Sequence, residues 1–317
     1  MGNFLTIGLS TMESVGTLFV FIFLGYFFSR KKIIPSGSGA TLSKLTADVF
    51  FACYIFEKVR AIRIEELTSN SVLAVSGVVF FFFATVVALL VVLFFKKSPI
   101  DRKTLVYLFT FGNYGYFGSP VIEKVCGADF VAKMILFTTF MTIMFSTYGY
   151  FLLTGDKDKP LWKMILSPST ISVVAGVAVG LSGLQLPSFV NSIVGSASAC
   201  MSPISMLLVG VVLSKYDLKD LVRGGVDSYM ITFVRLIALP LLAGLIFYPL
   251  TLLFPILKPA ALYGVVVSAM PAGLNTVVFV EAAGKDSSQT ARICFLTFLF
   301  SLIVLPIILG LTLMLFA

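Results

Sequence analysis

The chain has 317 residues, of which 58% are hydrophobic and only 12% are charged, and its formal net charge is +8. A soluble domain carries roughly 25% charged residues, so most of the surface of this protein must face lipid rather than water. The composition excludes an ordinary soluble domain and predicts one polytopic membrane unit rather than two soluble domains.

Ten apolar runs follow one another along the chain, each close to the length that a membrane-spanning helix requires. They predict an all-α polytopic membrane protein with ten transmembrane helices. The predicted spans lie at approximately 12–29, 38–56, 70–95, 103–126, 129–154, 160–182, 188–214, 227–250, 259–282 and 287–316. No positive charge precedes the first run, which is therefore interpreted as a span and not as a signal peptide.

The lysines and arginines are distributed unevenly between the two sides of the predicted bundle. Fifteen lie on one side, which includes Lys96–Lys103, and six lie on the other. The positive-inside rule places the richer side in the cytoplasm and both termini outside the cell membrane. The basic residues thus follow a membrane pattern, and no nucleic-acid partner is expected.

Ten spans divide into two sets of five, residues 1–155 and residues 156–317. An odd number of spans in each set gives the second set the inverted orientation, which predicts a 5+5 inverted repeat. Inverted repeats are a common plan of transporters, with the binding site between the repeats. We therefore expect a single transporter unit in which corresponding spans share unusual features.

The fourth span is interrupted by glycines and a proline. The run from Phe111 to Pro120 contains Asn113, Gly115, Ser119 and Pro120 in the middle of an apolar segment. Proline removes a backbone donor and glycine weakens a helix, so the helix is expected to open near 112–119. Ser119 and Pro120 suit the N-cap and the first position of a second half-helix.

The ninth span has the same character, with Pro271, Gly273, Asn275 and Thr276 in mid-run. Two interrupted helices in matching positions of the two halves are a sequence indicator of a transporter site. The second half-helices would begin near the mid-plane, where their N-termini favour anions. The alternative is a pair of ordinary kinks in a packing scaffold. The predicted substrate-binding set comprises Asn113, Gly115, Ser119 and Pro120 of the fourth span, Arg235 of the eighth, and Pro271, Gly273, Asn275 and Thr276 of the ninth.

Ionisable residues inside spans are costly and usually functional or paired. Arg235, in the eighth span, either supplies positive charge to an anionic substrate or pairs with a carboxylate, and both interpretations stay open. Asp48 is interpreted as the partner of Lys44, one helical turn away. Glu123 is interpreted as a side chain that snorkels outward.

Motifs for enzyme chemistry are absent. The sequence contains no H-E-x-x-H, G-x-S-x-G or P-loop pattern and no histidine, and the four cysteines show no metal or redox spacing. We therefore expect a protein that is not an enzyme, with no cofactor and no metal site.

Several stretches resemble the auxin efflux carrier family. The fourth-span run Gly112-Asn113-x-Gly115-x-x-Gly118-x-Pro120 is similar to the signature of that family, and Met270–Asn275 is similar to its ninth span. Pro168-Ser169, Pro203–Gly210 and Arg235–Pro240 resemble its spans 6, 7 and 8. The family often has a proline near Ala52, which is missing here, and the long central loop of plant members is also missing. This indicates a short, prokaryote-type member.

The resemblance implies a fold with crossed broken helices 4 and 9, related in plan to bile-acid sodium symporters. It also implies an organic-anion substrate, such as a dicarboxylate or an indole acid, and a homodimer formed through helices 1, 2, 6 and 7. We expect a secondary transporter that works by alternating access in the lipid bilayer. Two alternatives remain, which are a symporter coupled to sodium or a proton, and a non-transporting receptor with the same fold.

Overall fold

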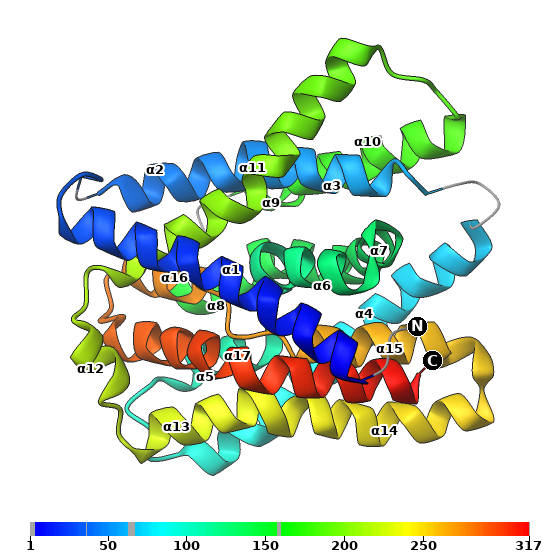
Figure 1. Cartoon of the computed structure of the whole chain (residues 1–317). Helices are drawn as coiled ribbons and strands as arrows, with labels where there is room; N and C mark the ends of the chain where they lie inside the picture. The colour runs from blue at the N-terminus through cyan, green and yellow to red at the C-terminus, as the bar shows by residue number, and fades with distance from the viewer. Residues whose placement is uncertain (1–3, 36, 63–66, 157–159, 317) are drawn as a thin grey trace.

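The computed structural model describes residues 4–35, 37–62, 67–156 and 160–316 (Figure 1). The described residues form helices and contain no β-strand, apart from one isolated bridge between Gly112 and Ala272. The helices are, in chain order, α1 (Phe4–Arg30), α2 (Ser38–Leu45), the π-helix η1 (Thr46–Phe51), α3 (Ala52–Val59), α4 (Leu67–Val92), the 3-10 turn η3 (Leu93–Phe95), α5 (Arg102–Thr110), the π-helix η4 (Tyr114–Gly118), α6 (Ser119–Cys126), α7 (Ala128–Met144), the π-helix η5 (Phe145–Gly149), α8 (Tyr150–Thr154), α9 (Leu161–Ile165), α10 (Pro168–Ser182), α11 (Ser188–Leu213), α12 (Leu218–Val222), α13 (Val226–Phe233), the π-helix η6 (Val234–Ala238), α14 (Leu239–Leu253), the 3-10 turn η7 (Pro255–Leu257), α15 (Lys258–Ser268), α16 (Asn275–Ala282) and α17 (Ser288–Leu315).

Six helical stretches among the described residues are long and apolar enough to cross a membrane. They are Phe4–Arg30, Ser71–Phe95, Ala128–Thr154, Ser188–Leu213, Val226–Leu253 and Ser288–Leu315. The other four predicted spans, near 38–56, 103–126, 160–182 and 259–282, coincide with shorter helices that turns, π-helices or unwound residues separate. An all-helical membrane protein is therefore confirmed.

We divide the helices into two layers, an upper layer of α1, α2, η1, α3, α10 and α11 and a lower layer of α4–α8 and α13–α17. In Figure 1, α2, α3, α10 and α11 lie at the top, α6 and α7 lie below them, and α1 crosses obliquely from the upper left toward the lower helices. Within the upper layer, α1 packs closely on α11 because Gly25 and Gly210 have no side chain. A Cβ on Gly25 would overlap the carbonyl of Leu207, and a Cβ on Gly210 would overlap that of Ile22. Small residues at a helix crossing allow such close backbone approach inside membranes. The layers meet where α1 contacts α6 and α17.

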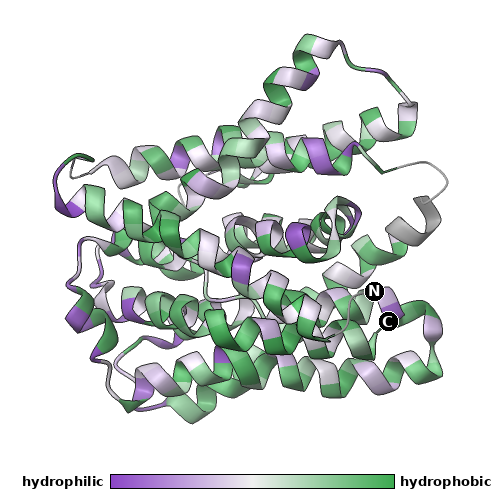
Figure 2. Cartoon of the chain, viewed as in Figure 1, coloured by the Kyte–Doolittle hydropathy of each residue, from purple (hydrophilic) through white to green (hydrophobic). Residues whose placement is uncertain are grey.

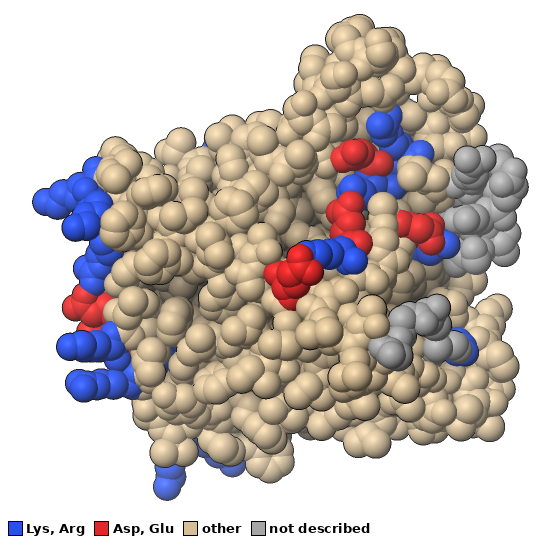
Figure 3. Space-filling view, in the orientation of Figure 1, with Lys and Arg blue, Asp and Glu red and all other residues tan. Residues whose placement is uncertain are grey.

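The surface matches a protein that is surrounded by lipid. Apolar residues cover most of the helices in Figure 2, and large apolar side chains such as Phe94 and Leu245 are exposed. Lys and Arg gather at the left end in Figure 3, the end at which α1 finishes and α12 lies in Figure 1. A mixed group of acidic and basic side chains lies further to the right on the same face. The broad area between these charged groups is uncharged.

Candidate functional site

The fourth and ninth predicted spans are both broken, and their unwound segments touch. Helix α5 ends at Thr110 before η4 begins at Tyr114, and α15 ends at Ser268 before α16 begins at Asn275. The backbone N–H of Asn113 donates to the carbonyl of Pro271 at 2.7 Å, beside the bridge between Gly112 and Ala272. Each unwound segment thus supplies hydrogen-bond partners to the other, as buried backbone groups require. We call this meeting point the crossover.

Two glycines of the crossover allow neighbouring side chains to pack closely against it. A Cβ on Gly115 would lie 2.8 Å from the ring of Phe51, and a Cβ on Gly118 would lie 2.8 Å from Sδ of Met270. Alanine at either position would force these buried or half-buried side chains apart. The glycines that break the fourth span therefore also let η1 and the ninth-span segment approach it closely.

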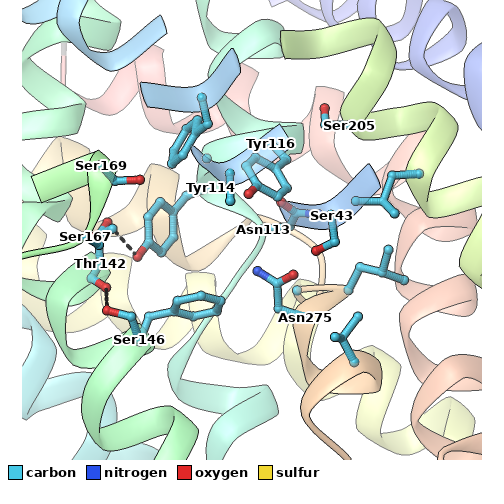
Figure 4. A pocket seen from close by; sticks show the side chains of 18 of the residues that line it. Ser43, Asn113, Tyr114, Tyr116, Thr142, Ser146, Ser167, Ser169, Ser205 and Asn275 are labelled. Atoms are coloured by element: carbon cyan, nitrogen blue, oxygen red, sulfur yellow. Dashed lines mark hydrogen bonds between the residues drawn. The ribbon is translucent and has the colours of Figure 1, made fainter. Parts of the chain in front are cut away.

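A cavity of about 290 Å³ adjoins the crossover (Figure 4). Asn113 and Asn275 both line it, although they are 162 residues apart. Hydroxyl-bearing and aromatic side chains make up much of the remaining wall. They are Ser43, Thr142, Ser146, Ser167, Ser169 and Ser205, together with Phe51, Tyr114, Tyr116, Phe145 and Phe279.

The two asparagine amides are bonded differently. Oδ1 of Asn113 accepts a hydrogen bond from the N–H of Phe117 at 3.3 Å, so this side chain caps the N-terminus of η4. Asn275 is the first residue of α16 and has no hydrogen bond from its side chain to another described residue. Its amide points into the cavity in Figure 4. Asn275 therefore offers a complete amide to a ligand, whereas Asn113 offers its NH₂ group.

Three π-helices bring side chains to the cavity wall. The helix η1 contributes Ala47, Asp48 and Phe51, η4 contributes residues 114–116, and η5 contributes Phe145 and Ser146. A π-helix widens one helical turn, and such segments often occur at functional sites. No lysine or arginine is among the described residues that line the cavity, and its charged side chain is Asp48.

The predicted pairing of Asp48 with Lys44 is wrong. No ion pair between them is present among the described residues, and Asp48 lines the cavity instead. The π-helix η1 begins at Thr46, between the two residues, and it contributes Asp48 to the cavity wall. The same π-helix interrupts the second span just before Ala52, at the point where the family often has proline.

The interpretation of Glu123 as a snorkelling side chain is also wrong. Its carboxylate accepts hydrogen bonds from Lys58 Nζ at 2.6 Å and from the hydroxyl of Tyr54 at 2.8 Å. Lys58 and Tyr54 belong to α3 in the upper layer, whereas Glu123 belongs to α6 in the lower layer. Glu123 thus connects the two layers.

The remaining predicted site residues divide between the cavity and its surroundings. Gly115 and Gly273 line the cavity. Ser119 lines a smaller neighbouring cavity of about 20 Å³, and its hydroxyl donates to the carbonyl of Tyr114 at 3.2 Å. The hydroxyl of Thr276 donates to the carbonyl of Gly273 at 2.7 Å, so this buried side chain stabilises the start of α16 from within.

Pro120, Pro271 and Arg235 are not among the residues that line the main cavity. Pro271 contributes through its carbonyl, which accepts the N–H of Asn113. Arg235 is 2% exposed and lies elsewhere at the crossover, where Nη1 donates to the carbonyl of Phe109 at 2.9 Å. Neither sequence interpretation of Arg235 anticipated a backbone carbonyl as its partner.

Several cavity residues were not predicted as site residues. Ser43, Thr142, Ser146 and Ser167 lie in apolar spans where a single serine or threonine commonly bonds its own helix, and Ser146 does bond the carbonyl of Thr142. No local sequence signal distinguishes such residues from cavity residues. The resemblance did include Ser169 and Ser205, within the stretches similar to spans 6 and 7.

Comparisons with known proteins agree with this architecture. The family model described as membrane transport protein matches the chain twice, over residues 10–161 and 157–309. A protein of Methanothermobacter thermautotrophicus (strain Delta H), described as an uncharacterized transporter, is 23% identical over 306 residues, which cover 94% of this chain and 97% of that protein. The two matches of the family model cover nearly the whole chain, and the chain therefore belongs to the auxin efflux carrier-like family of membrane transport proteins.

Proposed function

We propose that this protein is a secondary transporter that moves a small organic anion across the cell membrane by alternating access. The observation that carries the proposal is that Asn113 and Asn275, from the two broken helices, line one cavity. The amide of Asn275 and the NH₂ group of Asn113 provide hydrogen-bond donors for a carboxylate. The N-terminal ends of the helices that these residues begin add positive partial charge at the same place.

The cavity wall supports an anion with a single carboxylate and an aromatic body. No lysine or arginine is among its described lining residues, and Asp48 adds negative charge. A second carboxylate on the substrate would therefore lack a positive partner, because buried charges need one. The rings of Phe51, Phe145 and Phe279 suit an apolar or aromatic group. An indole-acid-like substrate fits this wall better than a dicarboxylate does.

The proposed architecture is ten spans in a 5+5 inverted repeat with a homodimer interface on helices 1, 2, 6 and 7. Support for the repeat comes from the double match of the family model, which divides the chain near residue 157. Under the proposed topology the cavity lies in the cytoplasmic half, because Ser43 and Ser167 are near cytoplasmic span ends and Phe279 follows the crossover toward that side. The Glu123 cluster would then close the outer half in this conformation.

Thermal unfolding of the purified protein with candidate anions tests the substrate class, because a ligand that binds the folded state stabilises it. Indole-3-acetate and benzoate are expected to raise the melting temperature more than succinate does at equal concentration. Counterflow of labelled indole-3-acetate in proteoliposomes then tests transport. Stabilisation by succinate alone would overturn the single-carboxylate assignment, and binding without counterflow would favour a non-transporting receptor.

A further inference from the structure

The side of the crossover away from the main cavity contains a buried cation. Arg235 lies in η6, in the middle of the long helix that α13 and α14 form, and is 2% exposed. None of the ion pairs among the described residues includes it. A buried charge without a partner carries a large desolvation cost, so its surroundings must stabilise it in another way.

The guanidinium group of Arg235 contacts the end of α5. Nη1 donates to the carbonyl of Phe109, in the last turn of that helix, at 2.9 Å. Nη2 lies against Gly112, where a Cβ would overlap it. The absence of a side chain at Gly112 is therefore a condition for this contact. The guanidinium group therefore contacts the backbone at Phe109 and at Gly112, the residue immediately before Asn113.

The end of α15 borders the same place. A small cavity of about 20 Å³ is lined by Arg235 and Thr110 together with Val267 and Ser268, the last residues of α15. Nε of Arg235 and Oγ1 of Thr110 are buried and have no hydrogen-bond partner among the described residues. A space of this size holds one water molecule, which requires at least two polar partners. These two atoms meet that requirement.

The C-terminal ends of helices carry negative partial charge, which a cation stabilises. In transporters with broken helices, such ends commonly coordinate a sodium ion. Here the ends of α5 and α15 meet beside a guanidinium, which stays protonated in proteins. The side of the crossover that faces the main cavity has the opposite character, because α16 and η4 begin there.

We propose that Arg235 is a resident cation of the crossover, built into the chain at a place where a broken-helix transporter would otherwise bind a metal ion. It neutralises the ends of α5 and α15, holds one water molecule with Thr110, and positions Asn113 for the substrate without touching the substrate itself. Arg235 is thus a positioning residue that acts through the backbone of Phe109 and Gly112. The stability tests of this assignment do not depend on the identity of the substrate, whereas the positioning of Asn113 for the substrate rests on the proposed function.

Chemical rescue tests this role in the purified protein. Arg235→Ala removes the cation and leaves a space of matching shape, so the melting temperature is expected to fall by several degrees. Low millimolar guanidinium chloride, too dilute to denature, is expected to recover part of that loss, whereas the same concentration of choline chloride should not. Sodium chloride is the third salt added to the Arg235→Ala protein, because a small cation bound at the ends of α5 and α15 would also raise its melting temperature.

The matched control is Met206→Ala, which creates a cavity at a fully buried residue of α11 in the upper layer. Guanidinium should not stabilise this variant or the wild-type protein. Equal effects of guanidinium on both variants, or an Arg235→Ala protein as stable as wild type, would overturn the proposal.

Arg235→Lys is the second variant and covers the case in which Arg235→Ala does not fold. Lysine keeps the charge with a different geometry, so this protein should fold and melt between wild type and Arg235→Gln. It should also bind indole-3-acetate more weakly than wild type, because the crossover backbone is less well positioned. A melting temperature of Arg235→Lys no higher than that of Arg235→Gln would show that charge is not what the site requires.

Discussion

At the scale of single residues, the two asparagines of the crossover have different bonding although the sequence presents them as equivalents. The side-chain oxygen Oδ1 of Asn113 accepts a hydrogen bond from the N–H of Phe117. The side chain of Asn275 forms no hydrogen bond to a described residue. The first residue is therefore both a helix cap and a cavity residue. The second contributes to the cavity alone, and substitutions are expected to separate the two roles.

Asn275→Ala is expected to weaken the binding of indole-3-acetate at least tenfold and to leave the melting temperature without ligand unchanged. Asn113→Ala is expected to weaken binding and also to destabilise the protein by about 1 kcal/mol, the typical cost of a lost N-cap. Isothermal binding and thermal unfolding measure the two effects. Asn191→Ala is the control, because the Asn191 amide bonds Leu186 and Arg60 away from the cavity. Unchanged binding in a folded Asn275→Ala protein would remove this residue from the site.

Gly112→Ala is expected to lower the melting temperature, because the new methyl group would overlap the guanidinium of Arg235. The matched control is Gly16→Ala in α1, where a Cβ meets no atom within 4 Å and alanine is the better helix former. In the double variant with Arg235→Ala, the cost of Gly112→Ala should shrink, since its steric partner has gone. Strict additivity of the two substitutions would contradict the contact.

At the scale of elements, two similar clusters connect the layers at opposite ends of the molecule. Glu123 on α6 binds Lys58 and Tyr54 of α3. Glu281 on α16 accepts hydrogen bonds from Lys215 Nζ at 2.6 Å and from the hydroxyl of Tyr216 at 3.3 Å, just beyond the end of α11. Each second half-helix therefore carries a glutamate that binds a lysine and a tyrosine of the upper layer. Under the proposed alternating-access mechanism, these two connections would break in turn.

Glu123→Gln is expected to favour opening toward the outside, because it removes the partner of Lys58, whose side chain is only 13% exposed. A cysteine in place of Thr139, which lines the small cavity beside Ser119, reports this opening. Labelling by a membrane-impermeant maleimide from outside, in a background without the native cysteines, should become faster in Glu123→Gln.

The control for this experiment is Glu281→Gln, which breaks the corresponding cluster at the other end and should not accelerate labelling of the same cysteine. If both glutamine variants accelerated labelling equally, the two clusters would not act on opposite sides of the membrane.

At the scale of the whole molecule, the distribution of charge predicts the orientation in the membrane. A cysteine that replaces Lys97 should be labelled only after the cells are permeabilised, because the basic end is expected in the cytoplasm. A cysteine that replaces Leu184, which is 61% exposed in the turn between α10 and α11, should be labelled in intact cells. Labelling of the Lys97 position from outside in intact cells would reverse the predicted topology.

The sequence by itself determined the membrane class, the family and the two breaks near Asn113 and Asn275, because apolar run length, glycine and proline act locally on the chain. Only the tertiary structure decided how residues at the breaks are used. Asp48, in the π-helix η1, lines the cavity and forms no ion pair with Lys44 among the described residues, and a π-helix has no reliable local signal. Arg235 and Glu123 have partners 126 and 65–69 residues away in the chain. Such pairings depend on how helices pack, so the partner of a buried charge follows from the fold and not from its neighbours in sequence.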